Sequence, residues 1–179
     1  MIGGTAGVRP IHIVQGEQAV SATAGDCLST ILGSCVAACL WDPQAGIGGM
    51  NHFLLPDAPY GASTDRRYGV QAMEMLINGL LTRGASRHGL RAKVFGGARM
   101  NAGMADIGAK NASFIRRFLA DEEIPLISES LGGVQARRVQ FWPVTGRARI
   151  NWVDGAAVAL ATPAAPDHPV PQTGELELF

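Results

Sequence analysis

A cysteine and a histidine seventeen positions apart, Cys35 and His52, are the residues of this chain whose types could do chemistry together. Between them lies Trp41-Asp42-Pro43-Gln44-Ala45-Gly46, in which Asp and Pro favour a type I turn that Gly can close. A turn centred after Pro43 pairs residues whose numbers add to 87, so Cys35 would face His52 across a β-hairpin. Cross-strand neighbours have Cβ atoms about 5 Å apart. An imidazole at that distance can activate a thiol as a nucleophile.

Attack on a carbonyl carbon requires the thiol to reach its thiolate form. An unperturbed thiol has a pKa of about 8.5, and a neighbouring imidazole lowers it through an ion pair and can later protonate the leaving group. The sequence therefore predicts a lowered pKa for Cys35. The carbonyl oxygen also needs N–H donors, for which the backbone at Cys35, Ser34 and Gly33 is the candidate. Gly33 permits the irregular backbone that points an amide inward.

A hydroxyl group is the candidate for orienting the imidazole, and two adjacent residues carry one, Ser29 and Thr30. In an unbroken strand Ser29 shares the face of Cys35 and Thr30 does not, because side chains alternate along a strand. A bulge near Gly33 would reverse that choice. Strand parity therefore favours Ser29, and both hydroxyls stay candidates.

A structural interpretation of the same residues competes with the catalytic one. A cysteine in a strand of Leu, Val and Ala is commonly a small buried hydrophobic residue, and we expect this of Cys27 and Cys39. A zinc site has little support, because the chain has no C-x-x-C pair and its other histidines are scattered. The catalytic interpretation of Cys35 and His52 depends on their facing positions in one predicted hairpin, where glycines lie close to both residues.

Composition restricts the class of protein. The chain has 179 residues, enough for one domain with a core. Its 15 basic and 15 acidic side chains give no net charge that would draw it to nucleic acid or an anionic membrane. Apolar residues make up 47% but form no run long enough to span a bilayer. Three cysteines and no evident signal peptide predict a reduced, cytoplasmic protein without membrane insertion.

Strands outnumber helices and hairpins dominate the expected elements, which indicates the α+β class. The expected strands cover 11–20, 29–41, 46–55, 90–95, 125–129, 138–142 and 147–153, and the expected helices cover 64–83 and 107–122. One domain is expected over 11–153, with a flexible N-terminus over 1–10 and an Ala/Pro-rich mobile tail over 154–179. Asn111 falls on the buried side of the second helix. Buried amides usually satisfy backbone groups, so we expect that use ahead of a place in the site.

The blocks around these residues resemble the CheD family, the chemoreceptor glutamine deamidases of bacterial and archaeal chemotaxis. The resemblance covers about residues 11–150. Its blocks are Leu32–Ala37, Trp41–Pro43, Gly48–Pro56, Lys93–Ala98, Ile107–Ala112, Leu131–Gly133 and Pro143–Arg147. It implies sandwich-like layered β-sheets with helices packed outside, Cys35 as the nucleophile and His52 as the base. The family's third catalytic residue is a hydroxyl six positions before the cysteine, which here is Ser29, with Thr30 next to it.

The reaction that the resemblance implies is hydrolysis of receptor glutamine side chains through a thioester, without a metal or organic cofactor. The implied substrates are the coiled-coil cytoplasmic helices of methyl-accepting chemotaxis proteins, and a CheC-type phosphatase is a further candidate partner. Residues 99–101 are candidate receptor contacts. Two alternatives stay open, namely a non-catalytic adaptor that binds receptor or phosphatase, and a methylesterase or protease that uses the same dyad.

Overall fold

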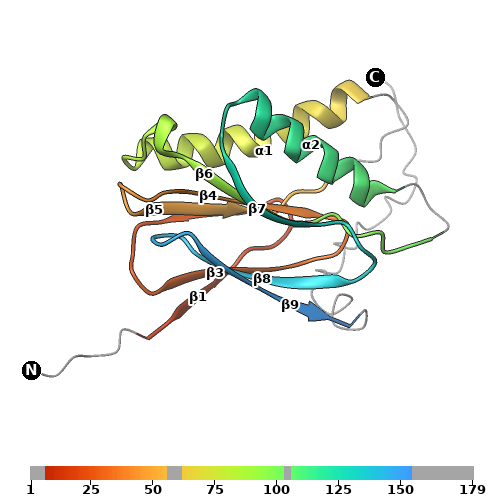
Figure 1. Cartoon of the computed structure of the whole chain (residues 1–179), viewed down its shortest axis with the longest axis horizontal. Coiled ribbons are helices and arrows are strands. Elements are labelled where there is room, and N and C mark those ends of the chain that lie inside the picture. Colours follow the sequence, from red (N-terminus) through yellow and green to blue (C-terminus); the bar gives the residue numbers. More distant parts are fainter. Residues whose placement is uncertain (1–6, 56–61, 103–105, 155–179) are drawn as a thin grey trace, which may run out of the picture.

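The computed structural model describes residues 7–55, 62–102 and 106–154. They form three layers, in which two helices cover one face of a sheet and a second sheet packs on its other face (Figure 1). The expected α+β class, with layered sheets and two main helices outside, is confirmed. Of the expected tail over 154–179, residues 155–179 lie outside the described residues, as does most of the expected N-terminal segment 1–10. The first strand already begins at Arg9, inside the segment 1–10.

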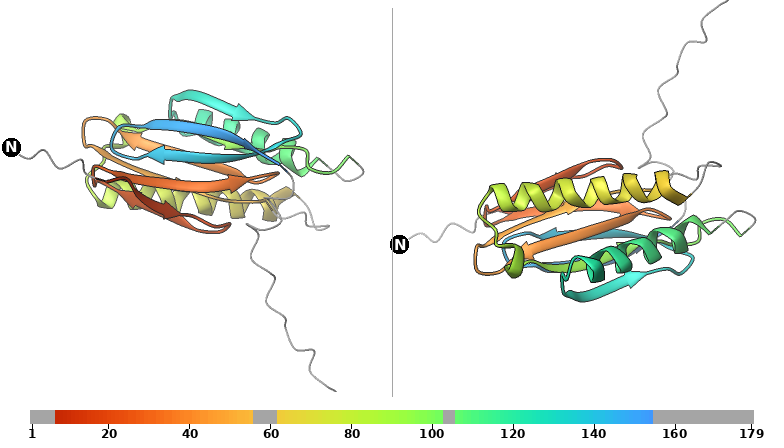
Figure 2. Two further views of the ribbon diagram at one scale, coloured as in Figure 1. Left: turned by 90° about the horizontal axis from the view of Figure 1, so that it is seen from below. Right: turned by 90° about the horizontal axis from the view of Figure 1, so that it is seen from above.

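The elements are β1 (Arg9–His12), β2 (Gln18–Ser21), β3 (Asp26–Leu32), β4 (Val36–Asp42), β5 (Ile47–Asn51), α1 (Ala62–Thr82), η1 (Arg87–Gly89), β6 (Arg91–Gly96), α2 (Ile107–Asp121), β7 (Leu126–Leu131), β8 (Ala136–Trp142) and β9 (Arg147–Val153). Sheet A has the order β1-β3-β8-β9, and sheet B has the order β2-β5-β4-β6-β7. Figure 2 shows α1 and α2 side by side across sheet B, with sheet A on the far side.

Strand β4 lies at the centre of both cores, because all seven of its residues are buried. Its even-numbered residues from Val36 to Leu40 pack under the helices with residues such as Leu76. Its odd-numbered residues from Ala37 to Trp41 pack on sheet A with residues such as Phe141. A strand covered on both faces has a nearly continuous apolar sequence. That continuity removes the alternation that would have marked where β4 begins.

Two of the expected strands were wrong in the same way. The segment 11–20 is two strands, β1 in sheet A and β2 in sheet B, and 29–41 is likewise split into β3 in sheet A and β4 in sheet B. In each case the chain crosses between the sheets, through 13–17 and through 33–35. In 29–41 both halves are apolar because both sheets contribute to the core between them, so hydrophobicity gives no sign of that break, whereas the polar residues 15–18 interrupt the segment 11–20.

The expected hairpin register was also wrong by two. Cys39 pairs with Met50 and Leu40 with Gly49, so paired numbers add to 89. The cause is a longer turn, in which the N–H of Gly46 donates to the carbonyl of Asp42 at 3.0 Å and Gly46 takes a φ of 64°. A shift of two keeps every side chain on its face.

The helices agree closely with expectation. Helix α2 begins after Asp106, whose carboxylate accepts the N–H of Ala109 at 2.9 Å, which is the N-cap contact expected from the sequence. The expected apolar stripe of α1 is buried against sheet B, with Met73, Ile77 and Leu80 at or near full burial. The helices therefore cover the side of sheet B that faces away from sheet A.

Candidate active site

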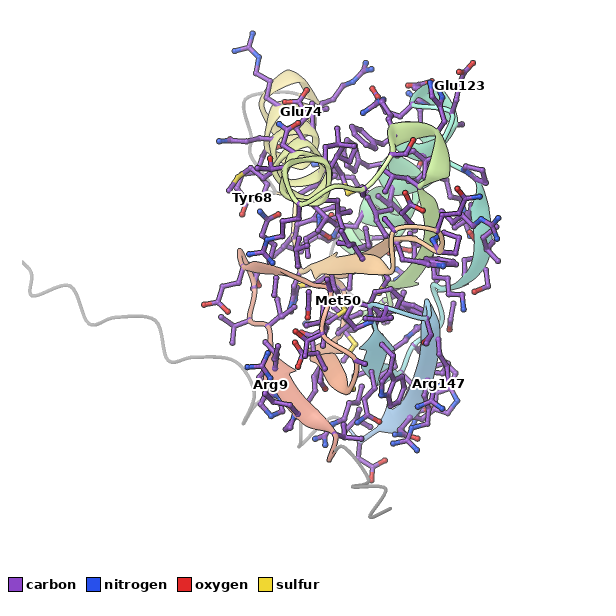
Figure 3. The ribbon with its side chains drawn as sticks, turned by 90° about the vertical axis from the view of Figure 1, so that its left-hand side faces the viewer. Arg9, Met50, Tyr68, Glu74, Glu123 and Arg147 are labelled. Atoms are coloured by element: carbon purple, nitrogen blue, oxygen red, sulfur yellow. The ribbon has the colours of Figure 1, made fainter. Side chains whose placement is uncertain are left out.

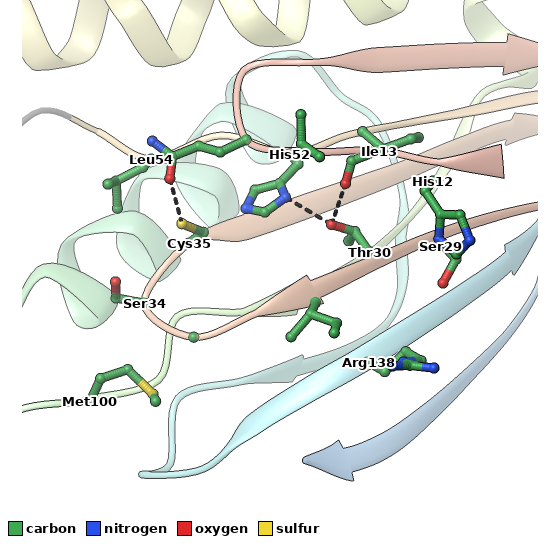
Figure 4. A pocket seen from close by; sticks show the side chains of 14 residues that line it. His12, Ile13, Ser29, Thr30, Ser34, Cys35, His52, Leu54, Met100 and Arg138 are labelled. Atoms are coloured by element: carbon green, nitrogen blue, oxygen red, sulfur yellow. Dashed lines mark hydrogen bonds between the residues drawn. The ribbon is translucent and has the colours of Figure 1, made fainter. Parts of the chain in front are cut away.

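The two crossings between the sheets meet beside a cavity of about 420 Å³. All six residues singled out from the sequence line it, namely Ser29, Thr30, Gly33, Ser34, Cys35 and His52. Figure 4 shows the imidazole of His52 between Cys35 and Thr30, with its two nitrogens turned toward these two residues. By the observed register Cys35 and His52 are diagonal neighbours on one face and not a directly opposed pair.

The hydroxyl of Thr30 determines the tautomer of His52. Thr30 Oγ1 donates to the carbonyl of Ile13 at 2.6 Å and lies 2.8 Å from His52 Nδ1. A hydroxyl has one hydrogen, and here the carbonyl takes it, so Oγ1 must accept from Nδ1–H. His52 Nε2 is then the nitrogen with a free lone pair. It is buried without a hydrogen-bond partner among the described residues, and it faces the side of Cys35.

Thr30, and not Ser29, is the hydroxyl that contacts His52. The parity argument fails because it assumed one strand from 29 to 41, and the chain changes sheets at Gly33. Even-numbered residues of β3 face the space between the sheets, where Leu28 and Leu32 join the core. Ser29 points to the outer face of sheet A, and its side chain also borders the cavity.

Burial keeps both catalytic candidates neutral. It raises the pKa of the Cys35 thiol to about 11 and lowers the pKa of His52 to about 4, because desolvation disfavours each charged form. The lowered thiol pKa expected from the sequence is therefore wrong for the resting site. The thiol instead donates to the carboxamide oxygen of Gln15, with Sγ and Oε1 3.5 Å apart. In this resting arrangement the thiol proton is therefore directed to Gln15 and not to His52.

The rate of Cys35 alkylation by iodoacetamide should reflect this neutral state. We expect it to rise about tenfold per pH unit between about pH 7 and about pH 10, because the thiolate fraction does so below its pKa. A Cys35→Ser variant measured in parallel subtracts any labelling of Cys27 and Cys39, which are buried. A rate that is already constant from about pH 5 upward would contradict this expectation and indicate a preformed ion pair.

The turn that carries Cys35 is held by its carbonyl groups. The carbonyl of Gly33 accepts from the N–H of Ala98 at 2.9 Å, and that of Cys35 accepts from the N–H of Gly97 at 2.8 Å. The carbonyl of Ser34 accepts from Asn111 Nδ2 at 2.9 Å. For the N–H of Ser34 the described residues offer no backbone acceptor. The carbonyl groups of the turn are therefore occupied by hydrogen bonds to the scaffold, and N–H groups of the turn remain to donate to a ligand.

Asn111 has the structural use that the sequence favoured. It is fully buried, and besides Ser34 it bonds the N–H of Leu55 through Oδ1 at 2.9 Å. One amide thus ties the nucleophile turn to the segment that follows His52. Asn51 has a similar position on the other side, where its Oδ1 accepts the N–H of Ala38 at 3.0 Å.

Sequence reasoning missed Gln15 and the carbonyl of Ile13. Both belong to the crossing between β1 and β2, which falls in the middle of the expected strand 11–20. The backbone of His52 fixes this crossing, because its carbonyl accepts from Gly16 at 2.8 Å and its N–H donates to Glu17 at 3.0 Å. No motif in the sequence marks Gln15. Of the candidate receptor contacts at 99–101, Met100 lines the cavity, and the other two are not among its lining residues.

Two other kinds of site are absent from the described residues. No group of three or more His, Cys, Asp or Glu side chains in 7–55, 62–102 and 106–154 is placed to hold a metal ion. In the same ranges no helix combines the length and the apolar character needed to cross a bilayer.

Comparison with known proteins gives a consistent family. Residues 54–151 match the family model described as CheD chemotactic sensory transduction. The chain is 51% identical over 173 residues to a protein of Caulobacter vibrioides, covering 94% of this chain and 92% of that one. It is 50% identical over 179 residues to a protein of Agrobacterium fabrum, covering 97% and 98%. Both relatives are named probable chemoreceptor glutamine deamidase CheD.

Two solved structures have a distant likeness to the chain. The hypothetical protein YfiH of Bacillus licheniformis superposes with a TM-score of 0.43 at 13% identity, over 70% of this chain and 60% of that one. The protein NMB0706 of Neisseria meningitidis superposes with a TM-score of 0.44 at 9% identity, over 70% and 63%. The chain thus spans less than two thirds of either.

Proposed function

The chain belongs to the CheD family, and from that premise we propose that it is a chemoreceptor glutamine deamidase, which hydrolyses glutamine carboxamides on receptors and releases ammonia. The observation that carries the proposal is the arrangement of Thr30, His52 and Cys35 beside an open cavity. We propose Cys35 as the nucleophile, His52 as the base and Thr30 as the hydroxyl that orients His52.

The first half of the reaction forms a thioester. Cys35 Sγ attacks the glutamine Cδ while its proton passes to His52 Nε2, which is the free nitrogen. The oxygen that becomes negative accepts from the N–H groups of the Ser34–Cys35 turn. His52 then returns the proton to the amide nitrogen, the C–N bond breaks, and ammonia leaves. Thr30 supports the transient imidazolium by accepting from Nδ1–H.

The second half regenerates the thiol. A water molecule gives a proton to His52 Nε2 as its oxygen attacks the thioester carbonyl. The C–S bond breaks, the sulfur regains its proton from His52, and the product leaves as a glutamate side chain. The sum is one amide and one water converted to one acid and one ammonia. Apart from the water and the substrate, the acting groups are the side chains of Cys35, His52 and Thr30 and the N–H groups of the turn.

Gln15 must change its contact during this cycle. In the resting site the thiol proton is directed to Gln15 Oε1, and His52 Nε2 has no partner among the described residues. Attack requires the same proton to be directed to Nε2. Gln15 is exposed, so its side chain can swing away when a substrate carboxamide enters.

Loss of the Thr30 hydroxyl should reduce catalysis without removing it. We expect Thr30→Val to lower kcat about 10- to 100-fold, because Nδ1–H of His52 and the carbonyl of Ile13 both lose a buried partner worth about 1–3 kcal/mol. Thr30→Ser should recover most of the activity, and Ser29→Ala should stay near wild type. Steady-state ammonia release measures all three variants. A larger loss in Ser29→Ala than in Thr30→Val would assign the orienting role to Ser29.

Mass spectrometry of a receptor cytoplasmic fragment before and after incubation tests the function itself. We expect the mass gain of amide-to-acid conversion at specific glutamines, together with free ammonia. Methanol release from a methylated fragment, without ammonia, would favour a methylesterase. Binding of the fragment without any mass change would favour an adaptor.

The compartment and the second partner are part of the proposal. The composition and the chemistry of a thiol nucleophile support a cytoplasmic enzyme that acts on the cytoplasmic helices of receptors. A CheC-type phosphatase as a further partner stays a prediction from the family resemblance. Co-elution of the two purified proteins in size-exclusion chromatography would test it.

A further inference from the structure

The outer surface of sheet A carries a cationic patch along β8 and β9. We call it the arginine face, and it consists of Arg138, Gln140, Trp142, Arg147, Arg149 and Asn151. These residues pair across the two strands as Arg138 with Asn151, Gln140 with Arg149 and Trp142 with Arg147, so their side chains share one side of the sheet. The intervening residues Ala148 and Ile150 pack toward the core. Arg138, Arg147 and Arg149 are exposed.

The arginines are held in place by neutral groups. The guanidinium of Arg147 lies 3.9 Å from the ring centroid of Trp142, and that of Arg149 lies 5.9 Å from it. Arg149 Nε also donates to Gln140 Oε1 at 3.0 Å. The four ion pairs recorded in the described part of the chain involve none of the three arginines. Arg147 and Arg149 are therefore held by neutral groups, and none of the three charges is neutralised by an ion pair among the described residues.

The arginine face is continuous with the catalytic cavity. Arg138 is a lining residue of the cavity that also contains Cys35 and His52. Ile31 pairs with Arg138 across β3 and β8 and lines the same cavity, as does Ser29. A polypeptide that lies on the outside of sheet A would thus reach Cys35 at the Arg138 end of the arginine face.

We propose that the arginine face docks a carboxylate-rich helical segment of the receptor, with the target glutamine presented at the Arg138 end. This inference rests on the proposed function. A guanidinium matches a carboxylate in bidentate geometry, and no acidic side chain stands among the face's six residues. Since the whole chain is neutral, attraction is local to this face and selects an orientation.

The chain offers a matched control on its opposite side. Arg66 and Arg67 are exposed on α1, which covers the side of sheet B away from sheet A. Figure 3 shows this separation, with Arg147 on sheet A and Glu74 of α1 at opposite ends of the view. Reversal of two arginines to glutamate changes the net charge equally at either place. The two double variants therefore differ only in which side of the protein carries the reversed charges.

The experiment compares R147E/R149E with R66E/R67E in deamidation of a receptor cytoplasmic fragment. We expect the first double variant to raise KM about tenfold or more, because like charges then meet at the interface, and the second to stay near wild type. Arg138→Glu, which changes one charge at the cavity end, should act in the same direction. Raising salt from about 50 to about 300 mM should raise the wild-type KM and reduce the difference between variants.

Two readouts separate docking from damage to the fold or the site. The alkylation rate of Cys35 and the thermal melting curve should be unchanged in R147E/R149E. If the wild type releases no ammonia, the proposed function fails. If the wild type is active and both double variants have the same KM, the docking inference fails alone. Binding to phosphatidylserine vesicles or to duplex DNA that R147E/R149E abolishes, with KM unchanged, would overturn it in favour of a lipid or nucleic-acid surface.

Discussion

Replacing Cys35 by alanine should lower ammonia release from the receptor fragment by at least about 10³-fold, because no other group can form the thioester. His52→Gln should cost about 10²- to 10⁴-fold, the usual contribution of general acid–base catalysis. The two residues act as a unit, so the double variant should be no slower than Cys35→Ala alone. Initial rates at saturating fragment measure all three.

A second buried cysteine provides the control for this experiment. Cys39 lies in β4, four positions after Cys35, and faces the core between the sheets. Cys39→Ala should lower stability slightly and leave kcat near wild type, because its sulfur has no access to the cavity. Cys35→Ala should keep its affinity for the fragment. Full activity in Cys35→Ala would refute the mechanism.

Gly96→Ala should damage both the stability and the activity of the protein. Gly96 has a φ of 110°, and a Cβ on it would lie 2.1 Å from the carbonyl oxygen of Cys35. The strained backbone and the clash together should cost about 3 kcal/mol or more, or about 6–12 °C in Tm for a chain of this size. Because the displaced turn carries the nucleophile, kcat should also fall, by about 10²-fold for a shift near 1 Å.

Gly132 separates the two causes. It has a φ of 82°, but an added Cβ would meet nothing within 4 Å. Gly132→Ala should therefore show the backbone cost alone, with a smaller loss of Tm and nearly normal kcat. Calorimetry and ammonia release on the same samples give both quantities. Equal effects at the two glycines would mean that the contact with Cys35 is unimportant.

The sequence was a reliable guide to several elements that depend on local residues alone. The cap at Asp106, the apolar side of α2 and the strand at 147–153 follow from a few adjacent residues, and the structure has them where expected. The pairing of Cys35 with His52 on one face was also inferred correctly, although its register was not. A register error of two residues leaves every side chain on the same face of its strand. The inference therefore held although the expected turn was wrong.

Features that depend on which sheet a strand joins could not be inferred. The pattern around Gly33 is apolar on both sides because both sheets bury their inner faces in one core. That pattern hides the change of sheet that brings Thr30 inward and Ser29 outward. The same change creates the desolvated cavity, so the raised pKa of Cys35 was hidden with it. Local composition carries no information about burial by distant segments.

The contact between Gln15 and Cys35 places this protein in competition with its own substrate. The side chain beside the nucleophile has the same functional group as the residue to be modified, and it is attached to the chain, so its effective concentration never falls to zero. A receptor glutamine binds only the fraction of molecules in which Gln15 has moved aside, and its apparent affinity is reduced by that fraction. For a glutamine on a docked helix, the contacts of the helix offset this loss of affinity, whereas free glutamine in solution has no such contacts. Because the reduction is the same factor for every amide, discrimination against small amides comes from the contacts that a docked helix makes outside the cavity.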